Sequence, residues 1–314
     1  VATARGDLVA LASALLLLYS ASTACIYVST NINGQLYHHA YSSAHERPQR
    51  TIKSTRHRSH RSWRQHSRAE GAIIHRDRLI FMRTPSQWTQ LLLVGALVIV
   101  YLLNFKYFRS LQDSGILGNV GIFGINFGLS GLIIATLAVR FLFPSISLEG
   151  KAFWCIESAP INNQQLFDAK RSWGLIPILV IGTALCAGAG LITQLSGSMI
   201  TISIVVTMIY SWTVCSMGSY LGGFDPQFNL DNPARVASSM TAVAFMMSAM
   251  FMLVAQLGLS LQPVWLLERY LTHGVIATPT SLIICGGLIT ALSILSWSAV
   301  FITRRIGLKG LANR

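Results

Sequence analysis

The 314-residue chain is strongly apolar, with 52% hydrophobic and only 11% charged residues. Several stretches run about twenty residues without a charge, which is the length that a helix needs to cross a bilayer. This composition excludes a water-soluble globular domain and predicts an integral membrane protein. The formal net charge of +13 does not indicate a nucleic-acid-binding protein, because 11 of the 24 Lys and Arg residues lie in residues 31–88 alone.

Seven apolar stretches predict transmembrane helices. Backbone polar groups within lipid must bond inside the same segment, so helices are required, and the fold class expected is all-α, a polytopic membrane helix bundle. The predicted spans are residues 8–29, 89–108, 116–139, 174–194, 198–222, 236–260 and 280–303.

The charge distribution divides the chain into three expected segments. A first transmembrane helix (1–30) precedes a basic cytoplasmic loop with an interfacial helix (31–83), and a six-helix transmembrane domain (84–314) follows. Lys and Arg concentrate in alternate connections, so the positive-inside rule predicts an outward amino end and an inward carboxyl end. An outward amino end without a signal peptide suggests a piece of a longer protein.

The loop of residues 31–83 is rich in Arg and holds seven of the eight histidines. Irregular His spacings with intervening Arg disfavour a metal site, and nucleic-acid binding is disfavoured because only Trp63 interrupts the basic run as an aromatic residue. The five cysteines are scattered without a C-x-x-C pair, which indicates core residues. We expect a solvated loop that attracts anionic lipid headgroups, and no metal or cofactor held by this chain.

The end of this loop predicts a helix lying in the membrane surface, because apolar and polar residues separate onto two sides. The apolar side consists of Ile73, Ile74, Ile80 and Phe81, and the polar side of His75, Arg76, Asp77 and Arg78, with Arg83 following. The second span then begins sharply. Thr84 fits an N-cap, Pro85 the first helical position and Gln87 the third, with Trp88 at the interface.

A second polar segment (144–173) separates the third and fourth spans. We expect a helix that begins at Leu148, is capped by Ser147 and ends at Pro160. Its outward residues are Glu149, Lys151 and Glu157. Such charges are expensive in hydrocarbon and tolerable at the cytoplasmic surface, so the segment is either a plain surface helix or a docking element that receives force from a soluble partner.

The predicted spans contain few polar side chains, and no Asp, Glu, Lys or Arg lies near the middle of any of them. This absence disfavours a proton- or sodium-coupled transporter, in which an intramembrane ionisable group is expected. Glycines at close spacing in the third span, among them Gly124 and Gly128, predict close helix packing. For Asn126 we favour a local interhelical hydrogen bond over substrate contact.

The connection before the sixth span, residues 224–239, carries Asp225, Asp231 and Arg235. Neither carboxylate has a third acidic partner nearby in the sequence, so a calcium site or acid–base catalysis is disfavoured. Asn232 followed by Pro233 predicts the start of the sixth span. No catalytic residue is expected, because the chain contains neither G-x-S-x-G nor H-E-x-x-H.

Three polar segments carry a family resemblance. The stretches "FPSISLEGKAFWCIESAPINNQQLFDAK" (143–170), "RDRLIFMRTPSQWTQLLLVGALVIVYLLNF" (76–105) and "FDPQFNLDNPARVASS" (224–239) resemble those of the bacterial ABC exporter membrane subunits, relatives of the type-2 ABC permeases. The resemblance covers about residues 65 to 260, in the same order and with the same intervening spans. It implies the permease subunit of an ATP-driven exporter in the bacterial inner membrane.

The resemblance also implies roles for the polar segments. Energy would come from a separate ABC ATPase that carries ATP and Mg²⁺, because this chain has no G-x-x-x-x-G-K-[ST] loop. Segment 144–173 would couple to that ATPase, through polar contacts and membrane-side anchors. The polar contacts would be Glu149, Lys151 and Glu157, the anchors Phe153 and Trp154, and a second docking turn Asp225, Asp231 and Arg235. A second membrane subunit or a homodimer would complete the transport path.

Two other functions stay open at this point. The chain could be a secondary carrier, whose transport persists without ATP and collapses with the ion gradient. It could also be a non-transporting membrane scaffold whose basic loop recruits lipid or protein. The mostly apolar spans suit a lipid, a peptide or a hydrophobic drug equally, so the sequence does not select a substrate.

Overall fold

The computed structural model describes residues 68–83, 85–113, 118–159, 161–228, 233–273 and 279–312, together with isolated residues between 16 and 30. The chain divides into two units, Val1–His60 and Arg61–Arg314, and the architecture below is that of the second unit. The described part of the chain is helical and contains no strand, which confirms the all-α fold class.

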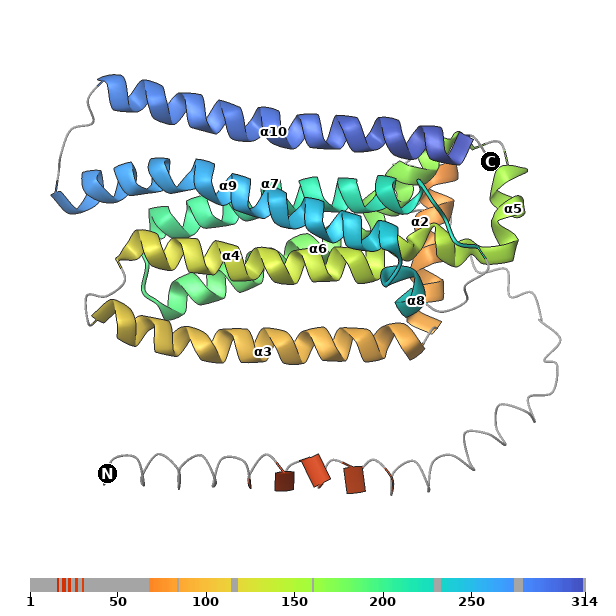
Figure 1. Cartoon of the computed structure of the whole chain (residues 1–314), viewed down its shortest axis with the longest axis horizontal. Helices are drawn as coiled ribbons and strands as arrows, with labels where there is room; N and C mark the ends of the chain where they lie inside the picture. Colours follow the sequence, from red (N-terminus) through yellow and green to blue (C-terminus); the bar gives the residue numbers. More distant parts are fainter. Residues whose placement is uncertain are drawn as a thin grey trace. The chain divides into compact units, whose positions relative to one another are not determined.

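Seven long helices make up most of the described residues of the second unit. They are α2 (Arg68–Arg83), α3 (Pro85–Asp113), α4 (Asn119–Leu137), α6 (Asn163–Ile192), α7 (Gly197–Gly222), α9 (Met240–His273) and α10 (Pro279–Ala312). Figure 1 shows α2 crossing one end of the bundle that the other six form, at the end where α5 (Phe153–Glu157) and the last turn of α10 lie. The short α8 (Pro233–Ala237) precedes α9.

Five described helices are long and apolar enough to cross a membrane: Asn119–Gly150, Asn163–Ile192, Gly197–Gly222, Met240–Tyr270 and Thr280–Leu311. A shorter apolar helix covers Leu91–Phe105. Six of the seven predicted spans therefore coincide with helices, and the expected span 8–29 lies largely outside the described residues.

Two helix starts differ from those expected. Helix α6 begins at Asn163, eleven residues before the predicted 174, because its first turns are polar and invisible to a hydropathy argument. The helix start predicted at Pro233 is that of the short α8, and Asn232 lies outside the described residues. Helix α9 begins at Met240, where the Ser239 hydroxyl accepts a hydrogen bond from the Ala242 amide at 3.2 Å. Helix α3 starts at Pro85 as predicted; the side chains of residues 84–90 lie outside the description.

The helix that contains α4 changes geometry at its end. A π-helical turn, η1 (Ala138–Leu142), is followed by the 3₁₀ turns η2 (Phe143–Ser145) and η3 (Ser147–Ala152). Pro144 lacks the amide hydrogen that an α-helix requires, which accounts for the loss of regular geometry there. Gly150 then adopts φ +54° and ψ −140°, a conformation open essentially to glycine alone, and the chain bends before α5.

The single helix predicted from Leu148 is therefore wrong. The Ser147 side chain caps no helix; its hydroxyl accepts a hydrogen bond from the Gln227 amide at 3.1 Å. Helix α5 starts only at Phe153 and ends at Glu157, while the predicted end at Pro160 lies outside the described residues.

Helices α4 and α7 supply many of the fully buried side chains, among them Phe127 and Tyr210. Asn126 is buried in this core and joins three helices. Its Oδ1 accepts a hydrogen bond from the Tyr101 hydroxyl of α3 at 2.7 Å, and its Nδ2 donates to the Cys186 carbonyl of α6 at 3.0 Å. These contacts confirm the predicted interhelical role of Asn126.

The glycines of α4 differ in what surrounds them, and the predicted packing role of Gly124 and Gly128 stays a prediction. A Cβ at Gly124 would meet Leu261 of α9 at 3.7 Å, an ordinary contact, whereas a Cβ at Gly128 would meet nothing within 4 Å. The closest approach is at Gly131, where a Cβ would lie 2.2 Å from Leu253. Gly131 lies two turns after Gly124, and both glycines face α9.

Candidate functional site

The three segments that carry the family resemblance meet at one end of the bundle. Ser147 bonds to Gln227, and the Phe153 ring stacks on the Phe228 ring with centroids 4.7 Å apart. These contacts bring segment 144–157 against residues 224–228. Helix α2 joins the same region through an ionic contact with Glu149.

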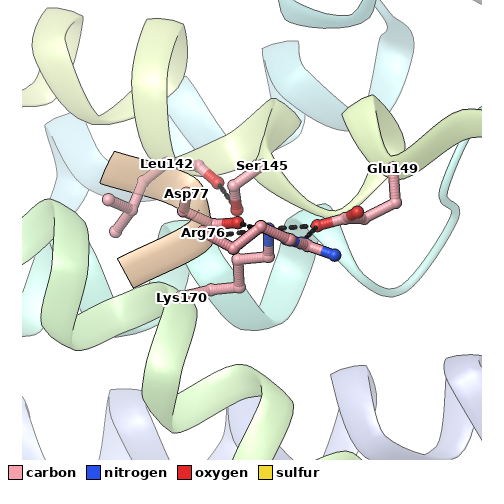
Figure 2. Close-up of polar contacts among 6 residues, drawn as sticks. All are labelled: Arg76, Asp77, Leu142, Ser145, Glu149 and Lys170. Atoms are coloured by element: carbon pink, nitrogen blue, oxygen red, sulfur yellow. Dashed lines mark hydrogen bonds and ion pairs between the residues drawn. The ribbon is translucent and has the colours of Figure 1, made fainter. Parts of the chain in front are cut away.

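That ionic contact belongs to an ion cluster of four residues, Arg76, Asp77, Glu149 and Lys170. Figure 2 shows the Lys170 ammonium lying between two carboxylates. Its Nζ is 2.7 Å from Asp77 Oδ2 and also contacts Glu149 Oε1. The Arg76 guanidinium makes the second bridge, because its Nη2 lies 2.9 Å from Asp77 Oδ1 and contacts Glu149 Oε1.

The cluster is largely buried. The side chain of Lys170 is 4% exposed and those of Asp77 and Glu149 are 9% exposed, while Arg76 is 38% exposed. Two cations and two anions give a neutral set, which makes burial tolerable. Removing one member would leave an uncompensated buried charge, at a cost of about 3–5 kcal/mol.

The charge of Arg76 is favoured in this arrangement. Burial lowers the pKa of its guanidinium, but the carboxylates of Glu149 and Asp77 outweigh that effect, so the net direction is upward. Arg76 therefore remains a cation throughout the accessible pH range. The cluster joins three elements, α2, η3 and α6, by charge-assisted bonds.

The burial of Glu149 corrects the sequence expectation that it points outward. The 3₁₀ geometry of η3 and the bend at Gly150 turn its carboxylate toward Lys170 and Arg76. Asp77 is corrected for a similar reason: it lies four residues after the buried Ile73, so both face inward on α2. Sequence reasoning did not select Lys170 as a site residue, although a lysine directly before an apolar span requires a partner or water.

Other predicted site residues do lie at the surface. Trp154 is 67% exposed and Glu157 is exposed, whereas Phe153 is half-buried against Phe228. The predicted role of Phe153 as a membrane-side anchor stays a prediction. Lys151 has no described side chain.

The other site residues predicted from the sequence lie on the 224–239 connection and at the end of α2. Asp225 is half-buried, Arg235 is exposed in the last turn of α8, and Arg83 is exposed at the end of α2. Asp231 lies outside the described residues. In the part of the chain that the structure describes, no three His, Cys, Asp or Glu side chains converge in a way that could hold a metal ion.

Comparison with known proteins gives one match. A family described as "Putative ATP-binding cassette" matches residues 1–313, nearly the whole chain. No curated protein and no solved structure matches the sequence. The family match agrees with the ABC relationship that the three converging segments indicate, and the chain belongs to the family described as "Putative ATP-binding cassette".

Proposed function

We propose that the chain is the membrane permease subunit of an ATP-driven ABC exporter, energised by a separate ATPase. The observation that carries the proposal is the convergence of three polar segments at one end of an apolar helix bundle, joined by the ion cluster. The family match supports an ABC relationship, and five helices of the described segments are long and apolar enough to cross a membrane.

The assignment of ATP hydrolysis to a separate subunit rests on a motif that the sequence lacks. The family description names an ATP-binding cassette, yet the 314 residues contain no G-x-x-x-x-G-K-[ST] loop to hold nucleotide phosphates. ATP and Mg²⁺ are therefore assigned to the partner ATPase, and this chain performs no hydrolysis. A second copy or another membrane subunit completes the path, in the bacterial inner membrane with the carboxyl end inside.

In the proposed coupling mechanism, the ATPase binds the exposed helix α5, and the buried ion cluster transmits the movement to α6. The ATPase contacts α5 through Trp154 and Glu157, which are exposed. Displacement of α5 moves η3, and η3 is tied to α6 by the pair between Glu149 and Lys170. Helix α6 is one of the helices long enough to span a membrane, so a movement at the surface reaches the bundle interior.

The test compares two tryptophans of equal exposure. Trp154 is 67% exposed on α5 and Trp297 is 68% exposed on α10. We expect Trp154→Ala to weaken ATPase co-purification and stimulation of ATP hydrolysis by roughly thirtyfold, because a tryptophan at an interface centre contributes about 2 kcal/mol. Trp297→Ala should leave both unchanged.

Three outcomes would contradict the proposal. Equal ATPase binding by the two variants would remove α5 from the interface. Failure of any ABC ATPase to co-purify would favour a scaffold. Transport that continues without ATP and stops when the ion gradient is collapsed would favour a secondary carrier.

A further inference from the structure

A cavity of about 250 Å³ lies beside the ion cluster. It is bounded by α2, α3, α6 and the η1–η2 turns, and its walls are mostly apolar. The aromatic part of the wall is continuous, because the Phe81 ring contacts Trp173 at 5.9 Å and Phe141 at 6.2 Å. Asp77, Glu149 and Lys170 of the ion cluster form a polar end of the cavity.

A second cavity of about 290 Å³ continues the first between α3 and α6. The two share Leu91 and Ile181, and every residue that lines the second one is apolar. Both are partly open to the protein surface. Along α6 the lining runs from Lys170 to Leu185, a length of roughly 22 Å. We call this continuous feature the α3–α6 groove.

The groove opens onto the apolar outer surface of the bundle. Ile176 and Val180 of α6 are 66% and 62% exposed, and Leu92 of α3 is 74% exposed. In a membrane such a surface faces acyl chains rather than water. An apolar groove that opens onto this surface is therefore accessible to acyl chains.

Arg140 supplies a charge at the polar end of the groove. It lines the first cavity from the π-helical turn η1, a geometry that is frequent at functional sites. Among the described residues it makes neither an ion pair nor a side-chain hydrogen bond. Since the ion cluster itself is neutral, Arg140 gives this end of the groove a net positive charge.

The position of Arg140 along its helix matches a membrane boundary. It lies 21 residues after the first residue of α4, Asn119, which corresponds to roughly 30 Å and hence to the thickness of the bilayer core. A cation at this depth is at the level of lipid phosphates.

From these observations we infer that the α3–α6 groove binds one anionic phospholipid. Its phosphate pairs with Arg140, and one acyl chain lies along α3 and α6 as far as Leu185. The combined shape, a groove about 22 Å long with a cationic end and apolar walls beyond it, suits an amphipathic anion of this kind. The groove shares Glu149 and Lys170 with the proposed coupling path, but lipid binding to Arg140 and the apolar walls does not depend on that function.

The test measures lipid retention by the full chain. The protein is reconstituted in nanodiscs with phosphatidylglycerol or phosphatidylcholine, and retained lipids are counted by native mass spectrometry. We expect one phosphatidylglycerol per chain, held in preference to phosphatidylcholine. Arg140→Gln should weaken retention about fivefold, the effect of one basic residue near an anionic headgroup, and Arg140→Lys should preserve it.

A second pair of variants tests the acyl-chain part of the groove. A Cβ at Gly95, which lines the second cavity, meets nothing within 4 Å, and the same is true of Gly287 on α10. Gly95→Phe should fill the groove and abolish retention, whereas Gly287→Phe should not alter it. Because both positions are open, both variants should fold, and this pair decides the question even if the arginine variants do not fold.

Several results would overturn the inference. Equal retention of the two phospholipids, unchanged retention by Arg140→Gln, or unchanged retention by Gly95→Phe would each do so. Recovery of a free fatty acid or a peptide in place of a phospholipid would also overturn it.

Discussion

Replacing Lys170 by Met removes one cation from the ion cluster while keeping the length of the side chain. The carboxylates of Asp77 and Glu149 then share only Arg76, so a net negative charge remains in a site where both are 9% exposed. The structure predicts a loss of about 3–5 kcal/mol in the free energy of unfolding, the cost of an unpaired buried charge. Adding Glu149→Gln to Lys170→Met restores neutrality and should recover a large part of the loss.

The assay is reversible unfolding of the purified chain in mixed micelles, titrated with SDS. The neighbouring residue provides a matched control. Arg171 pairs with Asp168 at 3.1 Å, but these side chains are 24% and 30% exposed, and an ion pair in contact with solvent contributes about 0–1 kcal/mol. Arg171→Ala should therefore cost less than 1 kcal/mol. Equal losses for the Lys170 and Arg171 variants, or no recovery in the double variant, would refute the cluster as the connection between α2, η3 and α6.

Three further predictions use the same unfolding measurement. Gly150→Ala should cost about 1–3 kcal/mol because of its φ of +54°, whereas Gly258→Ala, in an open helical position, should be neutral or slightly stabilising. Gly131→Ala should cost about 1–3 kcal/mol by overpacking, and Gly128→Ala, where a Cβ meets nothing within 4 Å, should not be destabilising. Tyr101→Phe should cost about 0.6 kcal/mol, the average interhelical hydrogen bond in a membrane protein, by removing its bond to α4.

The helices of the bundle are largely predictable from sequence. Charge-free stretches of about twenty residues identify spans because every backbone polar group in lipid must bond locally. The start of α3 at Pro85 follows from proline at the first helical position. The polar first turns of α6 are not visible to the same argument, because Asp168, Lys170 and Arg171 interrupt the apolar run although the helix continues through them.

The sequence predicts which segments form the candidate site, but it does not predict the ionic contacts between them. The sequence pattern places Glu149 outward only if the segment is an α-helix. The segment is not one, because it forms 3₁₀ turns from Phe143 onward and Gly150 has a positive φ. The partners of Glu149 are also distant in sequence, with Lys170 21 residues away and Arg76 73 residues away. No periodicity connects such positions, so the ionic contacts become evident only in the folded chain.

Helix α6 connects the two sites inferred here. Its residue Lys170 belongs to the ion cluster, and the same helix forms one wall of the α3–α6 groove up to Leu185. A phospholipid in the groove and an ATPase on α5 would therefore both act on α6. If movement of α6 changes the width of the groove, bound lipid and ATPase engagement must be energetically coupled, and linkage requires each to alter the affinity for the other by the same factor. The measurable consequence is a dependence of ATPase affinity on phosphatidylglycerol that disappears in Gly95→Phe and persists in Gly287→Phe.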